Sequence, residues 1–167
     1  HDRTAFWRLY VDAVDRLTWE ATRGYHHRFG NTQEWSKVTV SVFDYNAVGR
    51  EDFLGSVDID LTPGRAGLFT SPLDFKQSGD GDGGLLTYSI DYFEMPTSSR
   101  MRAVWRICIQ KAEHLIIADG IWGTSDPYLI LEASSAGYRF AQNSSVKPST
   151  LNPEWYETFE VPVMRRQ

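Results

Sequence analysis

Short stretches in which apolar residues alternate with polar ones recur along most of the chain. In KVTVSVFDY valine takes every second position, and in VWRICIQKA tryptophan and isoleucine alternate with arginine, cysteine and glutamine. A period of two residues is typical of a β-strand with one buried face, and Val, Ile, Tyr and Phe favour strands. The pattern predicts strands over residues 7–14, 37–45, 55–61, 85–93, 104–112, 127–133, 138–146 and 157–163.

The segments between these strands are rich in residues that favour chain reversals. They include NAVGRED, TPGRAG, SGDGDGG, GIWGTSDP and KPSTLNP, which supply the Gly, Pro, Asn and Asp that turns require. About eight short strands at this spacing are typical of an antiparallel sandwich. We therefore predict an all-β protein that folds as an antiparallel eight-stranded β-sandwich.

Composition and charge exclude several classes of protein. The formal net charge of -5, without a run of Lys and Arg, argues against a nucleic-acid partner, because phosphate contacts need clustered cations. Cys108 is the only cysteine in the 167 residues, so disulfides within the chain are excluded, and we expect a buried thiol in a reducing compartment. No apolar stretch is long enough to span a bilayer, and the first residues do not resemble a signal peptide. We expect a cytoplasmic location.

One strand motif occurs twice. Residues 7–11, WRLYV, are followed by Leu17, and residues 105–109, WRICI, are followed by Leu115 at the same spacing. Alternation of this kind can also recur by chance in β proteins. We favour true repetition, which indicates that the chain starts the same structural unit twice.

Two longer segments are similar to a known family. Residues 115–131, LIIADGIWGTSDPYLIL, followed by NPEWYETF at 152–159, resemble the first half of a C2 domain. This is the calcium-dependent phospholipid-binding module seen in conventional protein kinase C and synaptotagmin. Residues 38–60 resemble the second half of that module, although they come first in the chain. The resemblance implies a Greek-key arrangement of the sandwich.

Two domain organisations are compatible with this inverted order. In the first, residues 1–96 form one C2-like unit, with the second-half signature at 38–94 and the first loop missing, and residues 97–167 form the first half of a further C2 domain. In the second, residues 38–163 form one circularly permuted sandwich and residues 1–37 are an N-terminal extension. Because a half-domain would leave sheet edges unpaired, it is expected to pair within the chain or in a domain-swapped homodimer.

Oxygen-bearing side chains gather at the expected loops and indicate a calcium site. Calcium takes six to eight hard oxygen ligands, so its sites draw on carboxylates from loops that converge. Asp44, Asn46 and Asp52 flank one strand-to-loop transition, and Asp119 and Asp126 flank another. Asp and Asn are also common in ordinary turns. By resemblance, these five residues occupy the positions at which the family binds calcium.

Two features depart from the family pattern. Asn46 stands where the family most often has an aspartate, which keeps an oxygen ligand but removes a negative charge. The loop from Asp119 to Asp126 is one residue longer than usual, which can move Asp119 away from the metal. Both departures are expected to weaken calcium binding.

The resemblance also implies a membrane partner. Carboxylates crowded at one end of a sandwich repel an anionic bilayer, and bound calcium reverses this charge. Ile121 and Trp122 stand at the tip of one loop, where an indole can enter the membrane interface. We expect these two residues and Val48, in the loop between Asp44 and Asp52, to contact an anionic phospholipid surface. Trp122 can instead fold back onto the sandwich.

Catalytic signatures are missing from the sequence. It contains no Gly-x-Ser-x-Gly elbow, phosphate-binding glycine loop or zinc-type His/Cys spacing. We therefore expect a peripheral membrane module that is not an enzyme and that brings a larger protein to anionic phospholipid when calcium is present. The alternative is a calcium-independent protein-interaction or scaffold module that has kept the C2 fold without a working metal site.

Overall fold

The computed structural model describes residues 37–164, apart from residues 48, 50, 63, 77–78, 80, 118–122 and 136–137. The strand predicted over residues 7–14 therefore lies outside the described part of the chain. The eight strands are β1 (Lys37–Asp44), β2 (Asp52–Asp60), β3 (Gly67–Pro72), β4 (Leu85–Glu94), β5 (Met101–Glu113), β6 (Pro127–Ser135), β7 (Tyr138–Asn143) and β8 (Glu154–Met164).

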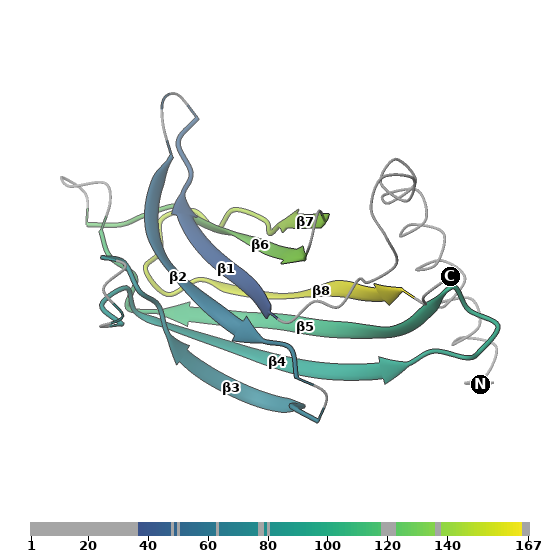
Figure 1. The fold of residues 1–167 in the computed structure, drawn as a ribbon. Coiled ribbons are helices and arrows are strands. Elements are labelled where there is room, and N and C mark those ends of the chain that lie inside the picture. Colours follow the sequence, from purple (N-terminus) through teal and green to yellow (C-terminus); the bar gives the residue numbers. More distant parts are fainter. Residues whose placement is uncertain are drawn as a thin grey trace, which may run out of the picture.

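The strands form two four-stranded sheets that lie face to face (Figure 1). Sheet A has the order β2-β1-β6-β7, and sheet B has the order β3-β4-β5-β8. Every pairing between neighbouring strands is antiparallel. The prediction of an all-β antiparallel sandwich is confirmed.

Alternation of side chains explains how the two sheets join. In β1, Val38, Val40 and Val42 are buried, and the residues between them are more exposed. In β5 the inward positions include Ile107 and Ile109. Because successive side chains of a strand point to opposite faces, one face of each sheet is apolar, and the two apolar faces pack into a single core.

A pairing between distant segments completes sheet A. Strand β1 lies between β2, its neighbour in sequence, and β6, which begins more than eighty residues later. The register places Val40 opposite Leu131 and Asp44 opposite Pro127. The sandwich thus combines strands from both of the segments predicted above, 1–96 and 97–167. The domain boundaries themselves stay predictions.

Two local expectations were wrong. Strand β3 was not predicted, because its residues GLFTSP lie between turn signals and only Phe69 and Ser71 are partly buried. Cys108 was expected in the core, but it is partly exposed on the outer face of sheet B, opposite Ser89 and Thr158. The reason is the strand period, which turns Ile107 and Ile109 inward and Cys108 outward.

Candidate functional site

Three of the predicted aspartates meet at one end of sheet A. Asp44 is the last residue of β1, and the register places it opposite Asp52 of β2 on one side and Pro127 of β6 on the other. Asp126 immediately precedes Pro127. We call this region, where β1 ends and where β2 and β6 begin, the loop end.

Asp44 links the two halves of the sequence at this end. Its side chain is fully buried, and its Oδ1 accepts the backbone N–H of Asp126 at 2.6 Å. The backbone N–H of Tyr45 in turn donates to the carbonyl oxygen of Asp126 at 2.9 Å. A buried carboxylate is costly unless it is hydrogen-bonded, so this contact holds the end of β1 against the start of β6.

Asp126 anchors a second loop. Its Oδ1 accepts the backbone N–H of Ser149 at 2.6 Å, and the N–H of Thr150 donates to the carbonyl oxygen of Ser125 at 2.8 Å. Ser149 has a positive φ of 51°, a conformation that is uncommon outside glycine. The segment between β7 and β8 is therefore fixed to the loop end by hydrogen bonds from its backbone N–H groups to the carbonyl oxygen of Ser125 and the side chain of Asp126.

The remaining predicted residues differ in their surroundings. Asp52 is exposed, and Asn46 is partly buried two residues beyond the end of β1. Asp119 and the predicted membrane contacts Val48, Ile121 and Trp122 lie outside the described residues. The register thus brings Asp44, Asp52 and Asp126 to one end of the sandwich, and their role in metal binding stays a prediction.

The donors at the loop end fit calcium by their chemistry. They are carboxylate and amide oxygens, the hard ligands that calcium takes, and they come from two loops. Within the described part of the chain, however, no three His, Cys, Asp or Glu side chains are grouped closely enough to hold a metal ion. One oxygen each of Asp44 and Asp126 already accepts a backbone N–H, so a bound cation would share these two carboxylates with the hydrogen bonds that they accept.

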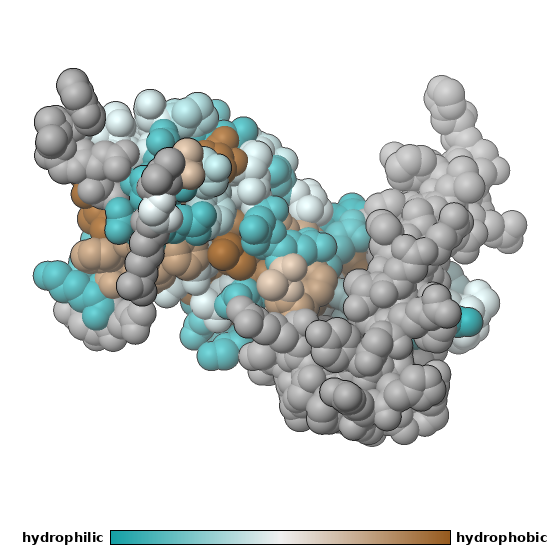
Figure 2. Space-filling model, turned by 90° about the horizontal axis from the view of Figure 1, so that it is seen from above, coloured by the Kyte–Doolittle hydropathy of each residue, from teal (hydrophilic) through white to brown (hydrophobic). Residues whose placement is uncertain are grey.

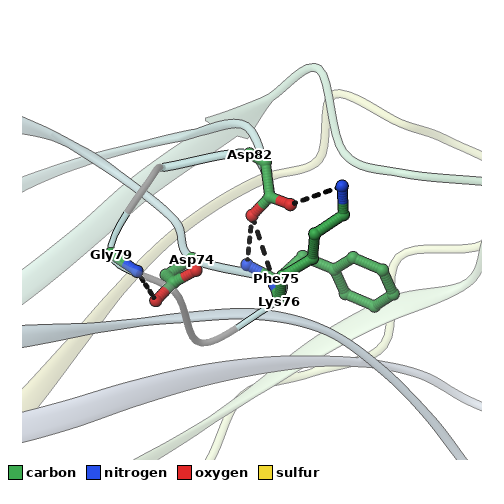
Figure 3. Close-up of polar contacts among 5 residues, drawn as sticks. All are labelled: Asp74, Phe75, Lys76, Gly79 and Asp82. Carbon is green, nitrogen blue, oxygen red and sulfur yellow. Dashed lines mark hydrogen bonds and ion pairs between the residues drawn. The ribbon is translucent and has the colours of Figure 1, made fainter.

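Two further carboxylates near this end have a structural role. They lie in and beside the SGDGDGG segment, which connects β3 to β4, and they hold that connection in place (Figure 3). Asp82 Oδ1 accepts the backbone N–H groups of Phe75 and Lys76 at 2.9 and 3.3 Å, and Asp74 Oδ2 accepts that of Gly79 at 2.8 Å. The hydrogen bond from Phe75 contributes most to lowering the pKa of the Asp82 carboxyl.

A tyrosine and glutamate pair was missed by the sequence analysis. The Tyr128 hydroxyl donates a hydrogen bond to Glu51 Oε2. Burial, followed by this contact with Glu51, raises the pKa of the Tyr128 hydroxyl. Glu51 precedes β2 and Tyr128 is the second residue of β6, so only the pairing of β1 with both strands brings them together.

In the part of the chain that the structure describes, no helix is long and apolar enough to cross a membrane. The fold and the acidic loop end define a β-sandwich module with carboxylates at one end. The family profile of the C2 domain matches residues 18–75 and 104–167, together more than half of the chain. The chain therefore belongs to the C2 domain family.

Individual relatives agree with this assignment. Synaptotagmin-9 of Homo sapiens is 31% identical over 140 residues, which cover 79% of this chain and 27% of the relative. Synaptotagmin-3 of Mus musculus is 32% identical over 128 residues, 72% of this chain and 20% of the relative. Protein unc-13 homolog 4B of Drosophila melanogaster is 50% identical over 56 residues, 33% of this chain and 5% of the relative. The chain thus spans about a quarter of the synaptotagmins, and no solved structure gives a significant match.

Proposed function

We propose that this C2 domain binds calcium at the loop end and thereby attaches to anionic phospholipid. The observation that supports the proposal is the register that brings Asp44 beside Asp52 and next to Asp126. Asp126 is far in sequence from Asp44 and Asp52, and the convergence of the three residues supplies carboxylates from two loops, as a calcium site requires. Asn46 and Asp119 are proposed to complete the ligand set.

Charge explains how calcium would control attachment. Two carboxylates about 4 Å apart repel each other by roughly 1 to 4 kcal/mol, depending on the effective dielectric constant. The metal-free loop end is therefore repelled by the anionic leaflet of a membrane. Bound calcium neutralises the loop end and offers coordination positions to lipid phosphate oxygens. Val48, Ile121 and Trp122 are the proposed membrane contacts, and the domain acts as a cytoplasmic peripheral module without catalysis.

A second candidate function has an observation in its favour. The carboxylates of Asp44 and Asp126 already stabilise the fold by accepting backbone N–H groups, a role that needs no metal. A C2 domain that uses its aspartates in this way can serve as a calcium-independent protein-interaction module. The two functions differ in their response to calcium.

Co-sedimentation with phosphatidylserine vesicles, in calcium and in chelator, separates the two functions. The informative variant is Asp52→Asn, because Asp52 is exposed and its replacement should leave the fold intact. Asp60→Asn is the matched control, since Asp60 is an exposed aspartate at the other end of the same strand. We expect calcium-dependent binding by the native chain and by Asp60→Asn, and weakened binding by Asp52→Asn. Binding that ignores calcium, or equal binding by both variants, would contradict the proposal.

A further inference from the structure

Five aromatic rings form a continuous row on the outer face of sheet A at the loop end. The row runs through Phe75, Phe53, Phe43, Tyr128 and Tyr45, and successive ring centroids are 6.3, 5.7, 5.9 and 6.3 Å apart. The strand register explains its centre, because Phe43 of β1 lies opposite Phe53 of β2 and Tyr128 of β6. We call these five residues the aromatic row.

The aromatic row is accessible at its two ends. Tyr45 is 43% exposed and Phe75 is 37% exposed, Phe43 and Phe53 are partly buried, and Tyr128 is buried. Figure 2 views the molecule from the side of sheet A, where apolar patches lie beside hydrophilic surface. Large aromatic side chains at such positions are typical of binding surfaces.

A carboxylate contacts the aromatic row toward each of its ends. Glu51 is exposed and its carboxylate accepts a hydrogen bond from the hydroxyl of Tyr128. At the opposite end, Asp82 is fixed by the N–H of Phe75. Lys76 Nζ is 3.9 Å from Asp82, but 73% of its side chain is exposed, so this ion pair is weak. The surroundings of the aromatic row are therefore acidic.

Aromatic rings next to carboxylates are complementary to arginine. A guanidinium stacks on an aromatic face and at the same time binds a carboxylate through its fork of N–H groups. In an extended peptide, alternate side chains lie on one side and about 7 Å apart, close to the spacing of the rings. The same surroundings repel anionic lipid. We propose that the aromatic row binds an extended, arginine-bearing segment of a partner protein.

A peptide titration tests this inference without the calcium site. The probe is a short fluorescent peptide of alternating arginine and serine, and a peptide with lysine in place of arginine is its control. Fluorescence anisotropy is measured in chelator and about 150 mM salt, which screens charges beyond about 8 Å. Because calcium is removed, the result does not depend on the proposed membrane attachment.

The informative variant is the double replacement Tyr45→Ala and Phe75→Ala. We expect the arginine peptide to bind roughly tenfold more weakly to this variant, because two cation–π contacts are lost. Glu51→Gln should also weaken binding, and the lysine peptide should bind native protein less tightly than the arginine peptide.

The matched control is Tyr156→Ala with Leu68→Ala, which removes side chains that are 60% and 65% exposed on other strands. This variant should bind the arginine peptide as the native chain does. Equal losses in the two double variants, or equal binding of both peptides, would overturn the inference. An unchanged peptide affinity of the Tyr45 and Phe75 variant would also overturn it. If binding of that variant to phosphatidylserine vesicles fell instead, the aromatic row would be a lipid contact.

Discussion

Sheets A and B differ in strand length and in what lies at their ends. Three strands of sheet B, β4, β5 and β8, have 10, 13 and 11 residues, whereas β1, β2 and β6 of sheet A have 8, 9 and 9. Sheet A ends at Asp44, Asp52 and Asp126, and its outer face carries the aromatic row. Sheet B supplies much of the core, while the proposed calcium site and four of the five aromatic-row residues lie on or beside sheet A.

The candidate site at the end of sheet A depends on one long-range strand pairing. Strand β1 pairs with β2 across a short loop, but it must also pair with β6, which is distant in sequence. Loop closure over such a distance costs entropy, which the buried contacts between the strands must offset. The site can therefore form only when sheet A is complete.

The largest effect is expected from the core at this junction. Leu131 of β6 is fully buried opposite Val40, so Leu131→Ala should lower the free energy of unfolding by about 2 to 5 kcal/mol. Its neighbour Ile130 is on the outer face, and Ile130→Ala should cost less than half as much. Chemical denaturation of both variants measures the difference. A larger loss for Ile130→Ala would mean that the face of β6 is assigned incorrectly.

A smaller effect is expected at the loop end. Asp126→Ala removes the acceptor of the Ser149 N–H and should destabilise the metal-free protein by about 1 to 3 kcal/mol. Asp52→Ala is the comparison, because Asp52 is exposed and its loss should be close to neutral. Denaturation in chelator measures both values. Equal stability of the two variants would contradict the structural role given to Asp126.

Carboxylates on the two sheets should give opposite dependence of stability on pH. On sheet B, burial raises the pKa of the Glu160 carboxyl, although Arg106 Nη2 is 3.5 Å away. The folded state therefore holds this proton more tightly, and stability is greatest below the ordinary pKa and falls as pH rises through the raised value. Glu160→Gln should remove that fall. Thermal melts between about pH 4 and 7 test this, and an unchanged pH profile would contradict it.

The smallest effect is expected on sheet A. The Thr39 hydroxyl, 2.6 Å from Asp58 Oδ1, is the main cause that lowers the pKa of the Asp58 carboxyl, with a further contribution from Lys37. The ionised Asp58 carboxylate therefore stabilises the folded state at pH values above its ordinary pKa. This stabilisation is lost as the pH falls through the lowered pKa of the folded state. Thr39→Val should reduce the free energy of unfolding at neutral pH by less than about 1 kcal/mol. It should also make the decrease of stability at acid pH smaller. Melts from neutral pH to about pH 3 measure both, and a steeper acid loss in Thr39→Val would be inconsistent with this contact.

Much of the fold was predictable because the strand period is local. The alternation of Val38, Val40 and Val42 specifies which face of β1 is buried, and the sandwich follows from several such strands. Strand β3 escaped prediction because an exposed edge strand carries little alternation. The same period, applied to Ile107 and Ile109, would have placed Cys108 on the outer face.

The candidate site was predictable only in part. Resemblance identified Asp44 and Asp126, but the hydrogen bond between them depends on the pairing of β1 with β6. Spacing along the chain cannot reveal such a contact. The aromatic row has the same origin, since Phe43, Phe53 and Tyr128 become neighbours only through the register of three strands.

The most direct test of the account is the melting temperature of the native chain and of Asp52→Asn as calcium is titrated, with magnesium as the control ion. A ligand that binds only the folded state raises the melting temperature with its concentration. The account predicts a rise with calcium in the native chain and a much smaller rise in Asp52→Asn. A native melting temperature that calcium leaves unchanged would contradict the calcium site and favour the calcium-independent interaction module.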